Sequence, residues 1–528
     1  MNDEANQGSH ASESLIEQLR SSLQRADSDQ PVELLETHIS WVLLTRDRAL
    51  KIKKPVRFDF LDFSTLDLRR QFCEEEVRLN RRLAADVYLG LLGVAPGANG
   101  PELRDAASCG ESALEWAVEM RRLPEELSLD NLIENDSITP EQTRRVAERL
   151  ATFYRGLSNE PVGDDEYRGR LESLVRNNRN ELLEAKLDLP DYIVHRIHAA
   201  QLQYLELSPE FTNRAAVHVV DGHGDLRPEH IYATDVPVVI DCLEFNASMR
   251  RVDTADELAF LEMECEALGA GDVGATIANL CFESLGDRPS DELLSFYKSY
   301  RACVRGKVAE LRSQQLSGES AETMLTRARR YLELANRYVD QFARPLLLVV
   351  RGLSGTGKST MAETIADAFG APLLQTDVVR RELQTPGASG DGYGEGDYTE
   401  ARRLAVYDRM LAGAVKSLEV GRTVVLDGTF LKRSLRRRAA NLASSFGAEF
   451  LVVNCQCPTD IVKERIRQRR AGGDTLSDAR PELLDAQRAD EEPVSPDLPQ
   501  LNFDTSAPLD ECRTQLLHEL RARFAAIH

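Results

Sequence analysis

The sequence predicts a multidomain protein, in which an α+β region at residues 30–343 is followed by an α/β region with a parallel sheet at residues 344–528. The length of 528 residues exceeds what one hydrophobic core commonly supports. Before residue 344, short strand-like runs precede long helical stretches, which is typical of an α+β arrangement. After it, strands alternate with helices, which is typical of a doubly wound parallel sheet.

The expected elements follow in order along the chain. Residues 1–29 are expected to be flexible, apart from a short helix within 14–23. The runs HISWVLLT and RALKIKKPV, separated by RD, predict a β-hairpin. Apolar spacing in LRRQFCEEEVRLNRRLA predicts a helix, ALEWAVEMRRL predicts a strand, and residues 255–343 are expected to be helical. Strands are also predicted in VHVVDGHGDL, PVVIDCLEFN, RPLLLVV, TVVLDGTF and FLVVNCQC.

The chain is acidic, with 65 Lys and Arg against 87 Asp and Glu and a net charge of −22. This excess of acid argues against general binding to nucleic acids or membrane surfaces. The nine cysteines form no CxxC pair and indicate reduced thiols rather than a disulfide or zinc framework. The polar start MNDEANQGSHASES lacks the apolar core of a signal peptide, and no apolar run reaches 18 residues. We therefore expect a cytoplasmic protein.

A glycine-rich stretch lies between the predicted strand RPLLLVV and a predicted helix, and it matches the phosphate-binding pattern GxxxxGK[ST] in full. Glycines let backbone N–H groups approach phosphate oxygens, and the following helix N-terminus adds partial positive charge. Lys358 is expected to act in catalysis by reaching the β and γ phosphates, and Ser359 to supply a hydroxyl to Mg²⁺. The predicted nucleotide-binding residues are Gly352, Leu353, Ser354, Gly355, Thr356, Gly357, Lys358, Ser359 and Thr360.

The residues after this loop resemble small P-loop kinases, particularly the group with polynucleotide kinase, zeta toxin and chloramphenicol phosphotransferase domains. In LLQTDVVRREL the resemblance makes Asp377 the candidate base beside an acceptor hydroxyl, with a helix N-cap as the alternative role. In VVLDGTF, Asp427 is the candidate that orients Mg²⁺-bound water or contacts substrate. ERIRQRR resembles an arginine lid, in which Arg465 and Arg469 would neutralise the transferring phosphoryl group; a solvated helix face is the alternative.

A second phosphotransferase-like pattern, HGDLRPEHIY, begins at His223. Asp225 is the candidate that accepts a proton from, or orients, an acceptor hydroxyl. Further along, Asp241 ends an apolar run, where a kinase-like enzyme holds Mg²⁺ against ATP phosphates. His230 stands where such loops carry a metal-binding Asn, and Mg²⁺ prefers oxygen to nitrogen. We expect an altered but working site, in which Asp241 holds the principal metal and His230 either hydrogen-bonds Asp225 or contacts phosphate. Glu244 would supply a replacement carboxylate, and a pseudokinase is the alternative.

The first region as a whole resembles the aminoglycoside phosphotransferase-like, or choline-kinase-like, branch of the protein kinase fold, although it lacks a GxGxxG loop. The resemblance makes ALKIKKP the strand with the phosphate-contacting lysine. Alternation places Lys51 and Lys53 on one face of it; Lys53 is favoured and Lys51 is kept open. The paired glutamate would be Glu76 or, nearly as well placed, Glu75. WAVEMRRL resembles the hinge that meets adenine around Met120, which fits a core position equally well.

The whole chain resembles bacterial fusions of an aminoglycoside phosphotransferase-like domain with a C-terminal P-loop ATPase or kinase domain. This implies an ATP-dependent phosphotransferase with two nucleotide sites, using ATP (or GTP) and Mg²⁺ to phosphorylate hydroxyl groups of small molecules. An RNA end is kept as a second acceptor, because KRSLRRRA offers a local anion site. The alternatives are a nucleotide-gated regulatory protein and a zeta-toxin-like or polynucleotide-kinase-like enzyme with a weak N-terminal domain. Neither the acceptors nor an oligomeric state follow from the sequence.

Overall fold

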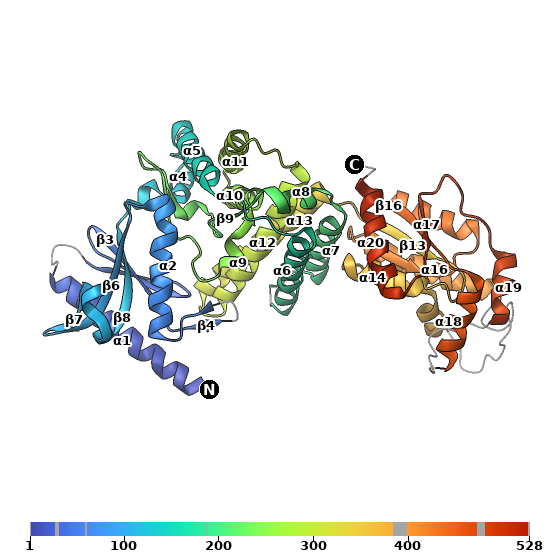
Figure 1. Ribbon diagram of the computed structural model, residues 1–528, viewed down its shortest axis with the longest axis horizontal. Helices are drawn as coiled ribbons and strands as arrows, with labels where there is room; N and C mark the ends of the chain where they lie inside the picture. Colours follow the sequence, from blue (N-terminus) through green and yellow to red (C-terminus); the bar gives the residue numbers. More distant parts are fainter. Residues whose placement is uncertain are drawn as a thin grey trace. The chain divides into compact units, whose positions relative to one another are not determined.

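The computed structural model describes residues 2–26, 31–58, 61–185, 187–383, 399–471 and 481–525, and Figure 1 traces them along the chain. They form two compact units. The first unit comprises Met1–Gly163 and Arg214–Ser290, and the second comprises Asp164–Asn213 and Asp291–His528. This grouping differs from the sequence-based division at residue 344, because four helices that precede this position group with the P-loop region.

The first unit is built on a six-stranded antiparallel sheet with the strand order β1-β2-β3-β8-β6-β7. The predicted hairpin is confirmed, since β2 and β3 are antiparallel neighbours. The hairpin of β6 and β7 was not predicted. The strands of this sheet are β1 (Glu33–Glu36), β2 (Ser40–Leu44), β3 (Arg48–Lys53), β6 (Tyr88–Gly97), β7 (Gly100–Asp105) and β8 (Glu115–Arg121).

Two helices, α1 (Asn2–Ala26) and α2 (Leu66–Ala84), cover opposite faces of this sheet. Side chains of α1 pack in one apolar cluster with Leu50 and Ile52 of β3. Side chains of α2 pack in another with Val118 of β8. Because side chains alternate along a strand, Lys51 and Lys53 therefore face α2. Helix α1 begins earlier than the short helix that the sequence predicts.

The rest of the first unit is largely helical and carries three short two-stranded sheets. The loops that follow β9 and β11 hold the second phosphotransferase-like pattern. The remaining elements are β4 (Arg57–Phe58), β5 (Leu61–Asp62), α3 (Ala106–Cys109), α4 (Leu129–Glu134), α5 (Pro140–Gly156), α8 (Glu210–Val217, which spans the division between the units), β9 (Val219–Asp221), β10 (Ile231–Tyr232), β11 (Val238–Val239), α9 (Ala247–Arg250), β12 (Arg251–Asp253), α10 (Thr254–Ala267) and α11 (Gly271–Leu285).

The second unit contains a five-stranded sheet with the order β14-β15-β13-β16-β17, in which every neighbouring pair is parallel. The predicted parallel α/β sheet is thus confirmed, with β17 as a strand that was not predicted. Strand β13 is buried throughout, as expected for a central parallel strand. The strands are β13 (Leu346–Arg351), β14 (Leu373–Gln375), β15 (Val424–Asp427), β16 (Glu449–Gln456) and β17 (Gln500–Asp504).

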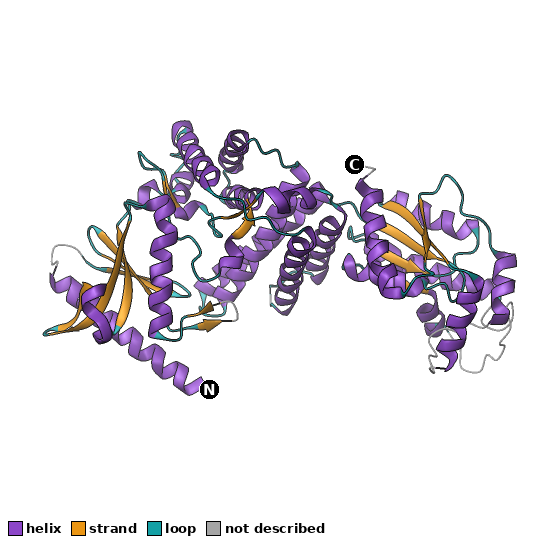
Figure 2. Cartoon of the chain, in the orientation of Figure 1, coloured by secondary structure: helices purple, strands orange, loops and turns teal. Residues whose placement is uncertain are grey.

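Helices cover both faces of this sheet, as Figure 2 shows with strands in orange and helices in purple. Leu348 and Val350 of β13 pack on α14 and α20, whereas Leu347 and Val349 pack on α16 and α17. The helices are α14 (Lys358–Ala368), α15 (Thr376–Glu382), α16 (Glu400–Leu418), α17 (Arg433–Ser445), α18 (Thr459–Ala471), α19 (Pro481–Asp490) and α20 (Leu509–Ala525).

Four further helices belong to the second unit: α6 (Asp164–Glu184), α7 (Asp191–Leu207), α12 (Asp291–Ser313) and α13 (Glu319–Phe342). Leu207 of α7 is part of the apolar cluster under the parallel sheet. Gln203 Nε2 also donates to the backbone carbonyl of Arg344 at 2.8 Å. These contacts explain why the helices group with the P-loop region rather than with the antiparallel sheet.

Candidate active site

The glycine-rich loop joins the end of β13 to the start of α14, which begins at Lys358. Gly355 and Gly357 both have a φ of +84°, a conformation that residues with a Cβ rarely adopt. Gly355 also lacks space, because a Cβ there would lie 2.9 Å from side-chain atoms of Val462 and Ile466. The loop therefore has the backbone conformation and the helix N-terminus that phosphate binding requires.

Two residues that the sequence analysis did not identify hold this loop in place. The backbone N–H of Ser354 donates to Gln487 Oε1 at 3.0 Å, and Gln487 Nε2 donates to Ser354 Oγ at 3.0 Å. The Thr505 hydroxyl donates to the backbone carbonyl of Thr356 at 2.5 Å. Thr505 directly follows β17, so recognising that strand would have indicated it. Gln487 lies in a helix without any motif, and no sequence signal marks it.

Asp427 ends β15 and is only 4% exposed. Burial raises the pKa of Asp427, while the nearby Lys358 charge and Ser359 hydroxyl lower it. Gln375 Nε2 donates to Asp427 Oδ2 at 3.2 Å, whereas Oδ1 has no hydrogen-bond partner within the described residues. Such a buried oxygen is unfavourable unless it gains a partner, and Mg²⁺ is bound preferentially by oxygens. Asp427 and Ser359 therefore fit a Mg²⁺ site.

Asp377 lies in the first turn of α15 and is not the N-cap, which is Gln375. The alternative capping role of Asp377 is thus excluded. Gln375 pairs with Asp427 across β14 and β15, so the two aspartates lie at the carboxyl edge of neighbouring parallel strands. The negative charge of Asp377 also raises the pKa of Asp427. Arg380 Nη1 donates to Asp377 Oδ1 at 2.7 Å.

The structure shows the contacts of only one of the two predicted lid arginines. Arg465 Nη2 donates to the backbone carbonyls of Thr505 at 2.7 Å and Ala507 at 3.2 Å, beside Gly357 of the P-loop. Arg469 belongs to the same helix, but its side chain lies outside the described residues. These bonds place Arg465 at the P-loop rather than on a solvated helix face.

The arginine-rich stretch KRSLRRRA does not present all its charges to solvent. Arg436 is fully buried. Its guanidinium donates to the backbone carbonyls of Leu431 at 2.9 Å, Glu492 at 2.9 Å and Pro493 at 2.7 Å. Arg436 therefore ties α17 to two loops and has a structural role instead of the anion-binding one.

In the first unit, two lysines share one glutamate. Lys51 Nζ lies 2.9 Å from Glu76 Oε1, and Lys53 Nζ lies 2.7 Å from Glu76 Oε2. Glu75, the other residue considered for this role, pairs with Arg78 at 2.7 Å instead. The two lysine charges hold the pKa of Glu76 below its usual value even though burial opposes this.

The two lysines differ in their other contacts. Lys51 forms an ion pair with Asp241, and its side chain is 12% exposed. Lys53 forms an ion pair with Glu244 and is fully buried, with Nζ 4.8 Å from the centre of the Phe63 ring. The sequence analysis favours Lys53, but the lysine that faces Asp241 is Lys51.

Cationic and polar groups surround Asp241. Burial opposes ionisation, but Lys51 and then His230 hold the pKa of Asp241 well below its usual range. His230 Nε2 lies 3.5 Å from Asp241 Oδ2 and 3.0 Å from Arg227 Nη2, while Nδ1 lies 2.9 Å from the backbone oxygen of Asp225. His230 is thus held by protein hydrogen bonds, and Glu244 pairs with Lys53. Among the described residues, no group of three or more His, Cys, Asp or Glu side chains is arranged to hold a metal ion.

A buried glutamate holds the loop that carries Asp225 through hydrogen bonds from the loop backbone. Glu257 of α10 accepts hydrogen bonds from the backbone N–H groups of His223, at 2.9 Å, and Gly224, and from the Tyr154 hydroxyl at 2.8 Å. His223 Nε2 lies 3.0 Å from the Ile240 carbonyl, and Asp225 N donates to His223 Nδ1 at 3.3 Å. Burial lowers the pKa of His223 to about 4, which keeps it neutral at pH 7.

Of the other predicted residues, Asp225 forms an ion pair and Met120 packs in the apolar core. The carboxylate of Asp225 pairs with Arg227 Nε at 3.0 Å, a partner that the sequence analysis did not identify. Met120 of β8 is 7% exposed and packs in the apolar cluster beneath α2.

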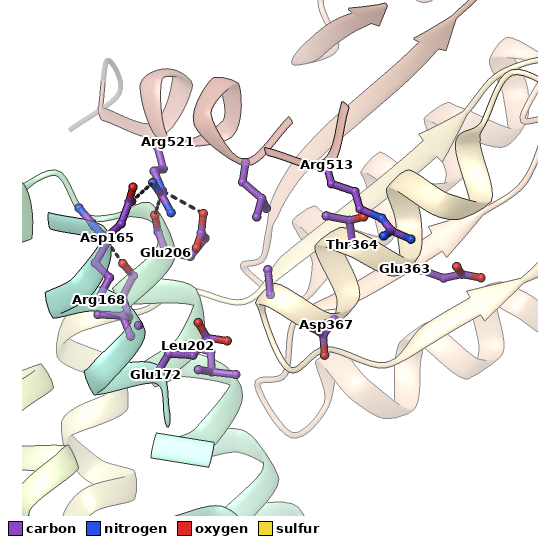
Figure 3. A pocket seen from close by; sticks show the side chains of 14 residues that line it. Asp165, Arg168, Glu172, Leu202, Glu206, Glu363, Thr364, Asp367, Arg513 and Arg521 are labelled. Atoms are coloured by element: carbon purple, nitrogen blue, oxygen red, sulfur yellow. Dashed lines mark hydrogen bonds and ion pairs between the residues drawn. The ribbon is translucent and has the colours of Figure 1, made fainter. Parts of the chain in front are cut away.

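The second unit also contains a cavity of about 460 Å³ away from the phosphate-binding loop. Helices α6 and α7 line one side and α14 and α20 the other, as Figure 3 shows. Arg521 reaches across this cavity, and its Nε lies 2.9 Å from Glu206 Oε1. Its α14 residues, Glu363, Thr364 and Asp367, lie beyond the first turn of that helix. None of the predicted site residues lines this cavity. No helix of the described chain is long and apolar enough to cross a membrane.

The loop, the parallel sheet and the buried aspartate together define a P-loop nucleotide-binding protein, and residues 347–494 match a family described as "AAA domain". The chain is 33% identical over 481 residues to "Uncharacterized protein Rv2004c" of Mycobacterium tuberculosis. This match covers 88% of this chain and 91% of that protein. The chain therefore belongs to the same family as Rv2004c.

Two further matches cover part of the chain. A "UPF0200 protein" of Aeropyrum pernix is 30% identical over 137 residues, which covers 25% of this chain and 68% of that protein. The crystal structure of a gluconokinase from Sinorhizobium meliloti 1021 has 22% sequence identity and a TM-score of 0.26, and covers 35% of this chain and 95% of that one.

Proposed function

We propose that the second unit transfers the γ-phosphoryl group of ATP to a hydroxyl group of a small molecule. The observation that carries this proposal is the buried, unpartnered Oδ1 of Asp427 beside Lys358 and Ser359 at the end of a P-loop. Asp377 lies at the edge of the neighbouring strand, where an acceptor would meet the phosphate. A protein that only bound nucleotide would not need this second carboxylate.

Each side chain has a distinct role in this proposal. Lys358 contacts the β and γ phosphates, and Ser359 and Asp427 hold Mg²⁺, which neutralises phosphate charge when bound. Asp377 orients the acceptor hydroxyl and accepts its proton as the new O–P bond forms and the bond to ADP breaks. Gln487 and Thr505 keep the loop in its binding conformation.

The test is transfer of label from radiolabelled ATP into a metabolite extract by the full chain, followed by mass spectrometry. Wild-type protein should produce labelled small molecules, and Asp377→Asn should lose those labelled products that also disappear in Lys358→Ala, while it retains nucleotide binding. Binding and ATP hydrolysis without any labelled product would favour the nucleotide-gated regulatory alternative. Labelled RNA ends would favour the polynucleotide-kinase-like alternative.

We also propose a second nucleotide site in the first unit, with Lys51 as its phosphate-contacting residue. The arrangement that supports it is the Lys51 ion pair with both Glu76 and Asp241, next to the loop with Asp225. In the Lys358→Ala chain, ATP should still bind, and Lys51→Met should then abolish this binding. If Lys358→Ala alone removed all ATP binding, the first unit would have no such site.

His230 offers a direct test of whether this second site also transfers phosphate. The Lys358→Ala chain is assayed with Mg²⁺ or Mn²⁺ and a broad set of hydroxyl compounds, because Mn²⁺ accepts nitrogen ligands more readily. We expect transfer, and His230→Asn should be tolerated. Transfer only after His230→Asn would show that the native site is a pseudokinase.

A further inference from the structure

The cavity that α6, α7, α14 and α20 enclose is large enough for an organic molecule. Its volume of about 460 Å³ lies within the usual range of small-molecule sites, about 300–1,000 Å³. Leu202 and Leu205 of α7 and Leu517 of α20 line it, and Figure 3 shows charged side chains on both of its sides. The cavity therefore offers a ligand both apolar surface and charge.

Two of the arginines that line the cavity are balanced by carboxylates just outside it. Arg168 is 6% exposed, and its Nε lies 2.9 Å from Asp164 Oδ1. Arg513 Nη1 lies 3.0 Å from Asp510 Oδ1. These two positive charges are thus already paired within the protein, so they do not make the cavity a site for an anion.

The third arginine is shared by two carboxylates of the cavity. Arg521 Nε lies 2.9 Å from Glu206 Oε1, and its Nη1 lies 3.9 Å from Asp165 Oδ1. One positive charge cannot balance both carboxylates. This part of the cavity therefore has one negative charge in excess.

A second shared arginine lies further along the cavity. Arg176 Nε lies 2.8 Å from Glu172 Oε1 on α6, and its Nη1 lies 3.7 Å from Asp367 Oδ1 on α14. Glu363, one turn before Asp367, forms no ion pair within the part of the chain that the structure describes. Among the described residues, the cavity and its ion-pair partners thus contain seven carboxylates and four arginines.

Two helices end at the cavity and add to its negative potential. Helix α7 ends at Leu207 and contributes Glu206, and α14 ends at Ala368 and contributes Asp367. The C-terminal end of a helix carries partial negative charge and favours cations. The carboxylates are spread along the cavity, and no group of three or more His, Cys, Asp or Glu side chains in the described chain is arranged to hold a metal ion. These features favour an elongated organic cation.

We propose that this cavity binds a linear aliphatic diamine or polyamine. One ammonium group lies between Glu172 and Asp367, and another lies beside Glu206. The methylene chain that joins them runs along the leucines of the wall, where its burial is favourable. This site is separate from the P-loop, and the inference does not rest on the proposed phosphotransfer.

The first experiment fills the cavity without removing a charge. Gly169 of α6 lines it, and a Cβ at this position would meet no packed neighbour within 4 Å, so Gly169→Leu can fold and occupy the space. Spermidine is titrated calorimetrically into the full chain. It should bind, and Gly169→Leu should weaken it about tenfold or more, because such sites bury most of a ligand's surface. Asn177→Leu is the matched control, since Asn177 is exposed on the same helix outside the cavity.

The second experiment removes the charges. Glu172→Gln and Asp367→Asn should each weaken spermidine binding about threefold, and together about tenfold, as expected for partly exposed ion pairs. Asp367 is 83% exposed, so its substitution should leave the fold intact. Glu181→Gln is the matched control on α6, because Glu181 is 47% exposed, against 44% for Glu172, and pairs with Lys307 outside the cavity. Butylamine should bind about tenfold more weakly than putrescine, the diamine of equal chain length.

Four outcomes would overturn the proposal. Spermidine bound equally by the wild type and Gly169→Leu would show adsorption to the acidic surface, and so would equal losses in Glu181→Gln and Glu172→Gln. Equal affinities for butylamine and putrescine would exclude a site for two ammonium groups. Displacement of spermidine by an equimolar amount of Mg²⁺ would identify a metal site instead. The proposed phosphotransfer depends on Lys358 and Asp377 and would be unaffected by any of these results.

Discussion

The two candidate nucleotide sites are built in opposite ways. In the second unit, a single stretch of chain supplies the loop, and its glycine conformations shape the cradle for phosphate. In the first unit, Lys51 and Lys53 meet Asp241 and Glu244 from positions 190 and 191 residues away, and side-chain ion pairs define the site. The contiguous site depends on local backbone geometry, whereas the dispersed site forms only when the unit has folded. Substitutions should therefore affect nucleotide binding more than stability in the second unit, and stability more than nucleotide binding in the first unit.

The strongest test of this contrast is Lys53→Met. The substitution leaves Glu244 buried without its lysine, and breaking a buried pair costs about 3–5 kcal/mol. Urea unfolding followed by tryptophan fluorescence reports this unit specifically, because the chain has two tryptophans and both, Trp41 and Trp116, lie there. Arg144→Met is the control, since Arg144 pairs with Glu141 and Glu148 on the exposed face of α5, and it should cost less than about 1 kcal/mol. Equal losses in the two variants would contradict the contrast.

Lys358→Ala should act mainly on binding and turnover. The loss of one charge contact to the β and γ phosphates should cost about 3 kcal/mol of transition-state stabilisation, or roughly 150-fold in turnover. Isothermal titration with Mg²⁺ and ATP should show the P-loop site lost from the full chain and the urea midpoint unchanged. Lys416→Ala, at the last turn of α16, is the control for removal of a lysine. Unchanged nucleotide affinity in Lys358→Ala would remove the basis for a P-loop site.

The histidine that braces the Asp225 loop predicts an acid response of the first unit. His223 is neutral when folded down to about pH 4 but accepts a proton near pH 6.5 when unfolded. The free energy of unfolding should therefore fall as the pH drops from 6.5 towards 4, by up to about 3 kcal/mol. His223→Gln should flatten this dependence in tryptophan-detected urea curves. A slope that is the same in both proteins would show that other groups set the acid response.

Gln487→Ala should give the smallest effect of the four. It removes the two hydrogen bonds to Ser354, of which one fixes a backbone N–H of the P-loop, and typical hydrogen bonds contribute about 1 kcal/mol. We expect ATP affinity to fall about fivefold without loss of fold. Gln515→Ala, on the exposed face of α20 where the side chain bonds to Glu519, should leave the affinity unchanged. A Gln487 variant with wild-type affinity would show that the glycines and Thr505 alone fix the loop.

The sequence was most informative where function depends on consecutive residues. The spacing of Gly352, Lys358 and Ser359 predicted the loop, and the alternation of strands with helices predicted the parallel sheet around it. It was least informative where the deciding contact is tertiary. Alternation put Lys51 and Lys53 on one face, but only packing against Asp241 and Glu244 distinguishes the two lysines.

The same limit applies to the supporting residues. Gln487 and Glu257 act on backbone groups brought close by folding, and nothing in their local sequence marks them. The helices before residue 344 show the limit at the scale of whole elements. The sequence predicts helical structure before residue 344, but contacts such as that of Gln203 with Arg344 decide which core receives these helices.

The order of the two units along the chain has a consequence for synthesis on the ribosome. Residues 164–213 emerge long before residues 291–528, yet they belong to the same unit, with the last part of the other unit between them. On the nascent chain, helices α6 and α7 therefore leave apolar side chains such as Leu207 exposed until the residues of the parallel sheet have been synthesised. The first unit can complete its core once residue 290 has left the ribosome. Nascent chains stalled after residue 290 should thus expose apolar surface of this helical pair that the finished protein covers.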